Sequence, residues 1–197
     1  QAQPTLYDIN LTIYEGEKVV IVGPSGSGKS TLAHCLNGLI PFSYKGEVTG
    51  SLKILGQEAK EKGIYALSKM VGTVLQDPDA QFVGITVGED IAFALENDGL
   101  PQKEMVVRVE EASRAVEMEQ HLLASVHQLS GGQKQRTALA GVMVDHVRIL
   151  LFDEPLANLD PAAGKRAMAL IDRIQKEMKA TVVIIEHRLE DVLNAHV

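Results

Sequence analysis

A run of apolar, β-branched residues leads directly into a loop of glycines and serines, and this junction restricts the fold more than any other feature. The run Lys18–Val22 has the pattern of a strand covered on both faces. The loop fits the pattern G-x-x-x-x-G-K-[ST] without a mismatch, as Gly23-Pro24-Ser25-Gly26-Ser27-Gly28-Lys29-Ser30. Apolar residues at helical spacing follow it: Leu32, Cys35, Leu36 and Leu39. Strand, glycine loop and helix in this order predict a phosphate-binding loop.

The chemistry of such a loop explains its composition. Glycines let the backbone turn its N–H groups toward a phosphate, at the positive end of the following helix. In this pattern Lys29 reaches the β- and γ-phosphates of a nucleotide, and the hydroxyl of Ser30 ligates Mg²⁺. Gly23 to Thr31 are therefore candidate residues for binding ATP with Mg²⁺. The alternative is an ordinary Gly/Ser loop, which the flanking strand and helix make less favoured.

Strand and helix patterns alternate along the rest of the chain. Expected strands lie at 6–13, 71–75, 147–152 and 181–185, with hairpin-like material at 47–56. Helical patterns extend from 87 to about 128, from 131 onward and from 162 to 179. Strands that alternate with helices predict an α/β fold with a parallel sheet, and the helical middle would form a separate lobe.

Two carboxylates stand where the strand at 147–152 ends. Ligands of open α/β sheets bind at the carboxyl ends of the strands. Asp153 is then placed to hold Mg²⁺ through water, and Glu154 to polarise the attacking water as general base. A solvated loop after a strand is the alternative, and it is the commoner fate of an isolated Asp-Glu pair.

A second glycine-rich helix start occurs at Leu129-Ser130-Gly131-Gly132-Gln133. It can be read simply as a helix cap, in which Ser130 satisfies free N–H groups. The chain already contains one complete phosphate site, however. A second anion-binding helix start suits a phosphate presented by another copy of the protein.

Composition makes some classes of function less favoured, although a local basic patch stays open. The net charge of −7, the low aromatic content and the absence of Trp argue against a nucleic-acid surface. The single cysteine, Cys35, allows no internal disulfide and suits a reducing compartment. No signal peptide and no apolar run of roughly 20 residues is found in the sequence. We therefore expect a cytoplasmic location and no nucleic-acid partner.

The motifs occur in the order seen in ABC ATPases, which the chain resembles over nearly its whole length. The resemblance rests on the phosphate loop, Gln76, Leu129–Gln133, Leu150–Glu154 and His187. It implies a P-loop NTPase (RecA-like) parallel-sheet core with an antiparallel β subdomain and an inserted α-helical subdomain. In this division residues 1–197 form one ABC ATPase domain. Residues 1–76 and 129–197 are the nucleotide-binding core with the β subdomain, and 77–128 are the helical subdomain.

The same resemblance implies roles for individual residues. Ser130, Gly131, Gly132 and Gln133 would bind the γ-phosphate held by the partner's loop. Gln76 would sense Mg²⁺ and the attacking water, and His187 would contact the γ-phosphate and orient Glu154. The segment Asn158-Leu159-Asp160 would cross the dimer interface.

Each of these roles has a structural alternative. Gln76 would then only cap a strand end, and His187 would be a surface residue after a strand. Asp160 would be the N-cap of a helix that begins at Pro161.

Three segments resemble the ATPases of energy-coupling-factor (ECF) importers of vitamins and transition metals: Gln76–Val83, Val87–Phe93 and Glu186–Val192. The implied partners are a second ABC ATPase domain, identical or different, a transmembrane coupling subunit and a substrate-binding membrane subunit. The chain would then lie at the cytoplasmic face of the membrane. Gln81, Phe82 and Val83 would contact the coupling helices; the alternative is that Phe82 and Val83 are core of the small lobe.

The rival interpretations are a soluble ABC ATPase acting in DNA repair or on ribosomes, and a P-loop kinase or GTPase outside the family. About a hundred residues separate Ser30 from Leu129 without the sustained heptads of a coiled coil. The motif at Leu129–Gln133 argues against a kinase or GTPase. The family's adenine-stacking aromatic residue lies upstream of the position of Leu6, and its last strands follow His187. We therefore expect this chain to be a fragment of a longer domain.

Overall fold

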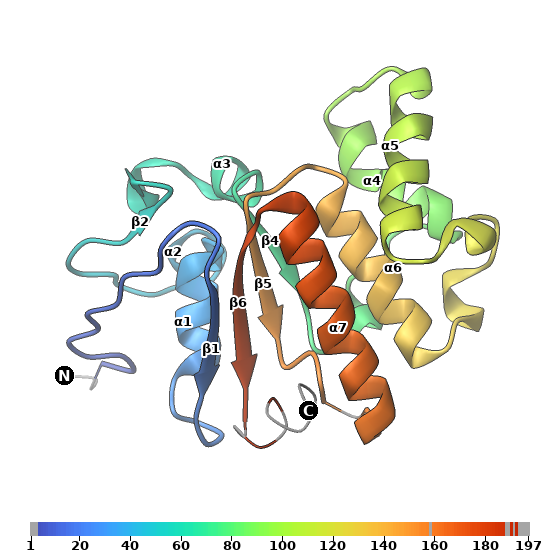
Figure 1. The fold of residues 1–197 in the computed structure, drawn as a ribbon. Coiled ribbons are helices and arrows are strands. Elements are labelled where there is room, and N and C mark those ends of the chain that lie inside the picture. The colour runs from blue at the N-terminus through green and yellow to red at the C-terminus, as the bar shows by residue number, and fades with distance from the viewer. Residues whose placement is uncertain (1–3, 158, 188–189, 191, 193–197) are drawn as a thin grey trace.

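A four-stranded parallel sheet forms the centre of the molecule. The structure is a computed structural model that describes residues 4–157, 159–187, 190 and 192. The strands are β1 (Lys18–Val22), β4 (Val71–Val74), β5 (Ile149–Asp153) and β6 (Thr181–Glu186), in the order β1-β6-β5-β4. All three pairings are parallel, so the carboxyl ends of the four strands point to one edge of the sheet (Figure 1).

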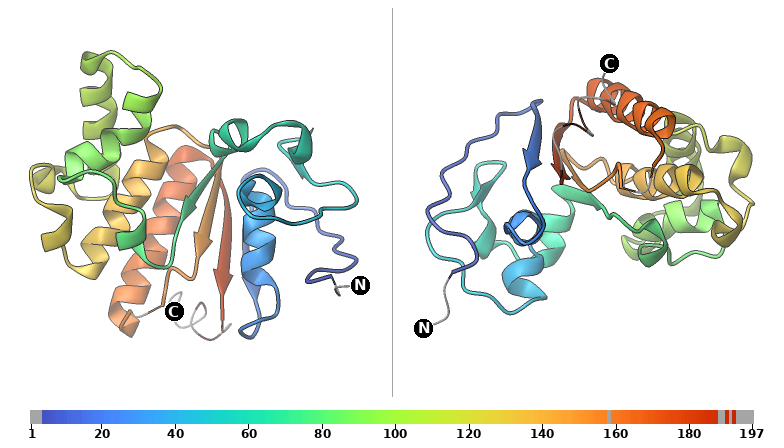
Figure 2. Two further views of the ribbon diagram at one scale, coloured as in Figure 1. Left: turned by 180° about the vertical axis from the view of Figure 1, so that it is seen from behind. Right: turned by 90° about the horizontal axis from the view of Figure 1, so that it is seen from below.

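Helices cover both faces of this sheet. α1 (Lys29–Leu36) lies on one face, while α6 (Gly131–Met143) and α7 (Pro161–Met178) lie on the other (Figure 2). The buried residues of α7 form one stripe toward the sheet: Gly164, Met168, Ile171 and Ile174. Because a helix returns the chain between parallel strands, α1, α6 and α7 all begin on the side where the strands end (Figure 1).

Smaller elements complete the fold. A separate antiparallel pair is formed by β2 (Lys53–Ile54) and β3 (Gln57–Glu58), beside the short helices α2 (Leu39–Phe42) and α3 (Ile64–Ser68). The helical middle consists of α4 (Val87–Asn97) and α5 (Gln102–Ala115), which pack with α6. Short 3-10 turns occupy Ala59–Glu61, Pro78–Ala80, Glu119–His121 and Val126–Gln128.

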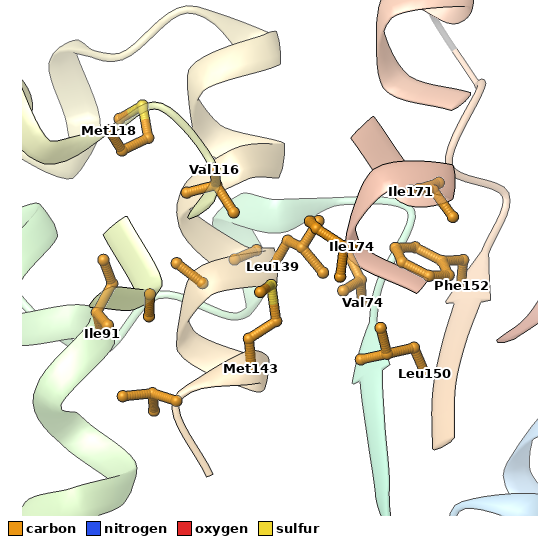
Figure 3. Packing of buried hydrophobic residues seen from close by; sticks show 14 of the residues in the cluster. Val74, Ile91, Val116, Met118, Leu139, Met143, Leu150, Phe152, Ile171 and Ile174 are labelled. Carbon is orange, nitrogen blue, oxygen red and sulfur yellow. The ribbon is translucent and has the colours of Figure 1, made fainter. Parts of the chain in front are cut away.

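The larger hydrophobic cluster joins the sheet to the helical middle. It runs from Phe152 and Ile171, through Leu139 on α6, to Ile91 and Met118 (Figure 3). A second cluster lies on the opposite face of the sheet, under α1. Alternate residues of β6 serve the two clusters, with Ile184 in the first and Ile185 in the second. β5 shows the same alternation, with Leu150 and Phe152 in the first cluster and Leu151 in the second, so both central strands are covered on both faces.

The predicted α/β class, the parallel core and the separate antiparallel pair are confirmed, and three local predictions are corrected. Residues 6–13 form no strand: Tyr7 is 82% exposed and Leu11 55%. Their alternation suits a strand, but in the described part of the chain they pair with no sheet edge, and a strand needs such a partner. Lys18–Val22 is a strand that is only half-buried, because it lies at the end of the described sheet. The helical segment breaks at Gly99, whose φ of 69° lies in the left-handed region, and at Pro101.

Candidate functional site

The glycine loop connects β1 to α1 in a backbone conformation that requires glycine at several positions. Gly26 and Gly28 have φ angles of 80° and 95°, and Gly28 is the N-cap of α1. A Cβ atom at Gly23 would lie 2.9 Å from Ser27 Oγ, which is closer than carbon and oxygen can pack. The backbone N–H of Ser27 donates to the carbonyl of Pro24 at 3.2 Å and closes the turn. The loop thus has the conformation expected of a phosphate cradle at a helix N-terminus.

The side chain of Lys29, at the C-terminal end of this loop, reaches back across it to Pro24. It is only 8% exposed, and Nζ donates to the carbonyl of Pro24 at 3.0 Å. No carboxylate of the described residues forms an ion pair with it. A buried ammonium group that has only a carbonyl as partner is incompletely compensated, and an anion in the loop would supply the missing charge. Ser30 is exposed and Thr31 half-buried, and both lie in the first turn of α1, directly after Lys29.

Asp153 lies at the end of β5 with one oxygen unused. Its Oδ1 is buried and has no hydrogen-bond partner among the described residues. Burial raises the pKa of Asp153, and the neighbouring charge of Glu154 raises it further, while His34, Lys29 and His187 oppose the shift. An unpaired carboxylate oxygen close to the start of α1 is a suitable ligand for Mg²⁺ or for its bound water.

Glu154 and His187 form the closest ionisable pair of the site. Glu154 Oε1 lies 2.7 Å from His187 Nε2, at the ends of the neighbouring strands β5 and β6. The glutamate is 7% exposed, and its φ of 53° is in the left-handed region. The sequence-based expectation that His187 meets Glu154 agrees with this geometry. An orienting donor on a buried carboxylate is the arrangement that a general base needs.

Gln76 and Asp160 lie at the same edge of the sheet. Gln76 is exposed, directly beyond β4, and β4 pairs with β5. Asp160 is the N-cap of α7 and accepts hydrogen bonds from the N–H groups of Ala162 and Ala163, both at 2.9 Å. The hydrogen bond from Ala163, followed by that from Ala162, lowers the pKa of Asp160. The capping role of Asp160 is thereby observed, whereas Asn158 lies outside the described residues.

The second glycine-rich helix start has both a cap and an open face. Ser130 accepts from the N–H of Gln133 at 3.4 Å, and Gln133 Oε1 accepts from the N–H of Ser130 at 2.9 Å. Gly131 and Gly132 are exposed, and a Cβ atom on either would meet no atom within 4 Å. The start of α6 and the phosphate loop lie on opposite sides of the sheet (Figure 1). The structure therefore does not bring Ser130–Gln133 to the phosphate loop of the same chain.

Sequence reasoning missed the structural use of Gln81. Its Nε2 donates to the carbonyl of Thr73 at 2.8 Å, and its Oε1 accepts from the N–H of Leu75 at 2.9 Å. The side-chain amide thus pairs with the free edge of β4 like a short piece of strand, and it closes the loop that carries Gln76. Phe82 packs against the larger cluster, whereas Val83 is 61% exposed. No sequence signal distinguishes such an amide from an exposed one.

Comparison with known proteins agrees with this arrangement. The profile of the ABC transporter family matches residues 6–157 of the chain. The chain belongs to the ABC transporter family.

Its curated relatives include ATP-binding proteins of ABC transporters from three bacteria. The Clostridium perfringens relative is 65% identical over 197 residues, which are 100% of this chain and 35% of the relative. The Enterococcus faecalis relative is 62% identical over 193 residues, with 98% and 34% covered. The Vibrio vulnificus relative is 60% identical over 195 residues, with 99% and 34% covered.

This chain therefore spans about a third of the length of these relatives. Among solved structures, CbiO1 from Clostridium perfringens superposes with a TM-score of 0.88 at 36% identity. The match covers 96% of this chain and 75% of CbiO1, which is described as part of the ABC transporter complex CbiONQ. Among the helices that the structure describes, none has the length and apolarity needed to cross a membrane.

Proposed function

We propose that this chain binds and hydrolyses ATP and thereby powers an ABC transporter. The observation that carries the proposal is the contact of 2.7 Å between Glu154 Oε1 and His187 Nε2, beside the unpaired oxygen of Asp153. It combines a buried base with an orienting donor at the end of the sheet where the phosphate loop begins. This is the constellation that phosphoryl transfer to water requires.

The residues of the chain divide the reaction between them. The loop from Gly23 to Thr31 binds the phosphates through its N–H groups, and the Lys29 ammonium neutralises the β- and γ-phosphates. Glu154 accepts a proton from the attacking water. The oxygen of that water bonds to the γ-phosphorus, and the bond between the γ-phosphorus and the β–γ bridging oxygen breaks. The products are ADP and inorganic phosphate, and His187 keeps the carboxylate aimed at the water. Ser30, Gln76 and Asp153 would hold Mg²⁺, which supplies charge stabilisation for the phosphates.

The open face of α6 favours a complete site shared between two ATPase domains. Ser130, Gly131, Gly132 and Gln133 lie away from the phosphate loop of their own chain. In our proposal they contact the γ-phosphate bound by a second ABC ATPase domain, either identical or different, while Asp160 and its neighbours cross the interface. Closure of the two domains around ATP then excludes water and completes the site. Hydrolysis reopens them.

The likeness to CbiO1 supports an ECF-type importer as the finer assignment. Residues 77–128 would then be the helical subdomain of a single ABC ATPase domain, with 1–76 and 129–197 as its core. The exposed side chain of Val83, next to the loop that carries Gln76, supports contact with a transmembrane coupling subunit. The complex would include a substrate-binding membrane subunit for a vitamin, a vitamin precursor or a transition metal. The chain would act at the cytoplasmic face of the membrane.

Glu154→Gln tests the catalytic assignment. The substitution keeps the size of the side chain and removes its basicity, so kcat for ATP hydrolysis should fall by about 100-fold or more. The affinity for ATP should remain, and ATP should trap a dimer that size-exclusion chromatography detects. Glu177→Gln, at an exposed position of α7, is the control and should hydrolyse ATP normally. Undiminished hydrolysis by Glu154→Gln would show that another group is the base.

The transport assignment needs a separate measurement. The full-length protein that contains this chain should copurify with hydrophobic membrane subunits from detergent-solubilised membranes. Copurification with ribosomes or DNA instead would contradict the transport assignment and leave the ATPase chemistry intact.

A further inference from the structure

We propose that Gln135 is a positioning residue for ATP hydrolysis, because it fixes the backbone turn that presents Glu154. The inference rests on the proposed role of Glu154 as general base. Gln135 lies on α6, two residues after the glycine-rich helix start, and it is half-buried. Its side-chain Nε2 donates to the carbonyl oxygen of Pro155 at 2.9 Å. Pro155 directly follows the catalytic glutamate in the chain.

The turn at Glu154 is one that the local sequence does not favour. Glu154 has a φ of 53°, in the left-handed region that a residue with a Cβ atom rarely adopts, because the Cβ atom comes too close to the following carbonyl oxygen. Such a conformation persists only where surrounding contacts hold it. Proline at 155 cannot donate a backbone hydrogen bond, so its carbonyl is the only backbone group through which other elements can hydrogen-bond to that residue.

Three consecutive residues of the turn are each held by a different residue. The N–H of Glu154 donates to the carbonyl of Ile185 at 2.9 Å. The N–H of Leu156 donates to Oε1 of Glu186, a carboxylate that is 3% exposed, also at 2.9 Å. Both of these anchors come from β6. Gln135 supplies the third anchor from α6, so the turn is fixed from two sides.

The anchor from Gln135 acts on the rate of the reaction more than on the binding of ATP. The phosphate loop belongs to the segment between β1 and α1, and among the described residues the side chain of Gln135 hydrogen-bonds to Pro155, not to that loop. Release of the Pro155 carbonyl would let the turn relax toward a more favourable φ and move the Glu154 carboxylate. A displacement of about 1 Å in a catalytic group costs on the order of 100-fold in rate. Lower kcat with unchanged ATP affinity is the expected signature.

Gln135→Glu is the direct test, because it keeps the size of the side chain and replaces the N–H donor with an oxygen that repels the Pro155 carbonyl. Measured in the full-length protein, kcat should fall by about 10- to 100-fold, while the Kd for ATP stays unchanged. Gln175→Glu is the matched control: Gln175 Nε2 donates to the carbonyl of Gly16 at 2.8 Å, the same kind of bond far from the site. Its kcat should remain at the wild-type value. Gln135→Lys, which keeps an N–H donor, should recover part of the lost rate.

The outcomes separate this inference from the proposed function. Full activity of Gln135→Glu beside an inactive Glu154→Gln would overturn the inference and leave the base assignment standing. Activity of Glu154→Gln would remove the base assignment, and the inference with it. If Gln135→Glu melts well below the Gln175→Glu control, Gln135→Met removes the donor without adding charge. Loss of the folded state in that variant too, or its full activity, would show that Gln135 does not position Glu154.

Discussion

Glu154 Oε1 and His187 Nε2 lie 2.7 Å apart although 33 residues separate them in the chain, because the strands that precede them are neighbours. Nothing in the local sequence of either residue brings them together. Parallel pairing of β5 with β6 places Asp153 opposite Ile185. Glu154, one residue after Asp153, then meets His187, two residues after Ile185, beyond the end of the sheet. The pair therefore depends on the register of the sheet.

His187→Ala should lower kcat about 100-fold, because the Glu154 carboxylate loses the donor that orients it. His187→Gln can still donate from its amide and should retain part of the activity. Steady-state ATP hydrolysis at saturating ATP measures both variants. Equal loss in the two would indicate that the imidazole itself, and not only its N–H donor, is required.

Lys29→Ala should abolish tight nucleotide binding. Hydrogen bonds to a charged group contribute about 1.5–3 kcal/mol, so the Kd for Mg-ATP should rise by about 10- to 100-fold. Isothermal titration calorimetry measures the change directly. Lys103→Ala removes an exposed lysine at the start of α5 and should leave the Kd as it is. An unchanged Kd in Lys29→Ala would argue that ATP binds elsewhere.

Asp153→Asn should stabilise the nucleotide-free protein near neutral pH. Burial raises the pKa of Asp153, so the acid contributes stability below its unfolded-state pKa and loses it as the pH rises through the folded-state value. The amide removes the charge that is unfavourable at higher pH. Solvent screens part of this effect at a half-buried site, and we expect Tm to rise by roughly 1–3 °C at pH 7.

Thermal melts across pH check this prediction. The advantage of Asp153→Asn should shrink as the pH falls, because the wild-type carboxyl then becomes neutral too. The variant should also lose the additional stabilisation that Mg²⁺ gives to the ATP-bound protein. A constant difference in Tm at every pH would show that the ionisation of Asp153 is not its cause.

Gly132→Val should fold normally and yet fail to hydrolyse ATP. A Cβ atom at this position meets no atom within 4 Å, so the isolated chain has room for the side chain. In the proposed dimer the same space holds the γ-phosphate of the second domain. We expect Tm to stay within about 2 °C of the wild type, since exposed substitutions usually change stability by at most 0.5 kcal/mol. ATP-dependent dimerisation should disappear. Normal hydrolysis by this variant would place the partner's nucleotide elsewhere.

The elements predicted best are those with a strong local signal. The glycine loop and the strands at Val71–Val74 and Ile149–Asp153 were read from short patterns whose chemistry is local. Residues 6–13 show the opposite case, since their alternation is genuine but a strand also needs an edge to pair with. Gly99 and Pro101 divide the helical middle into α4 and α5, whereas the hydrophobic periodicity by itself predicted an uninterrupted helical segment there.

The sequence by itself determined which chemical groups this protein carries and where they stand along the chain: a glycine loop with a lysine, carboxylates after a buried strand and a histidine after another. These follow from residue types and spacing, because glycine conformation and charge are local properties. Only the tertiary structure decided how they meet. The pairing of β5 with β6 sets Glu154 beside His187, and the packing of α6 against the sheet brings Gln135 to Pro155. The contacts of His187 and of Gln135 join residues 33 and 20 positions apart in the chain. Their geometry comes from sheet register and helix packing, which no short pattern encodes.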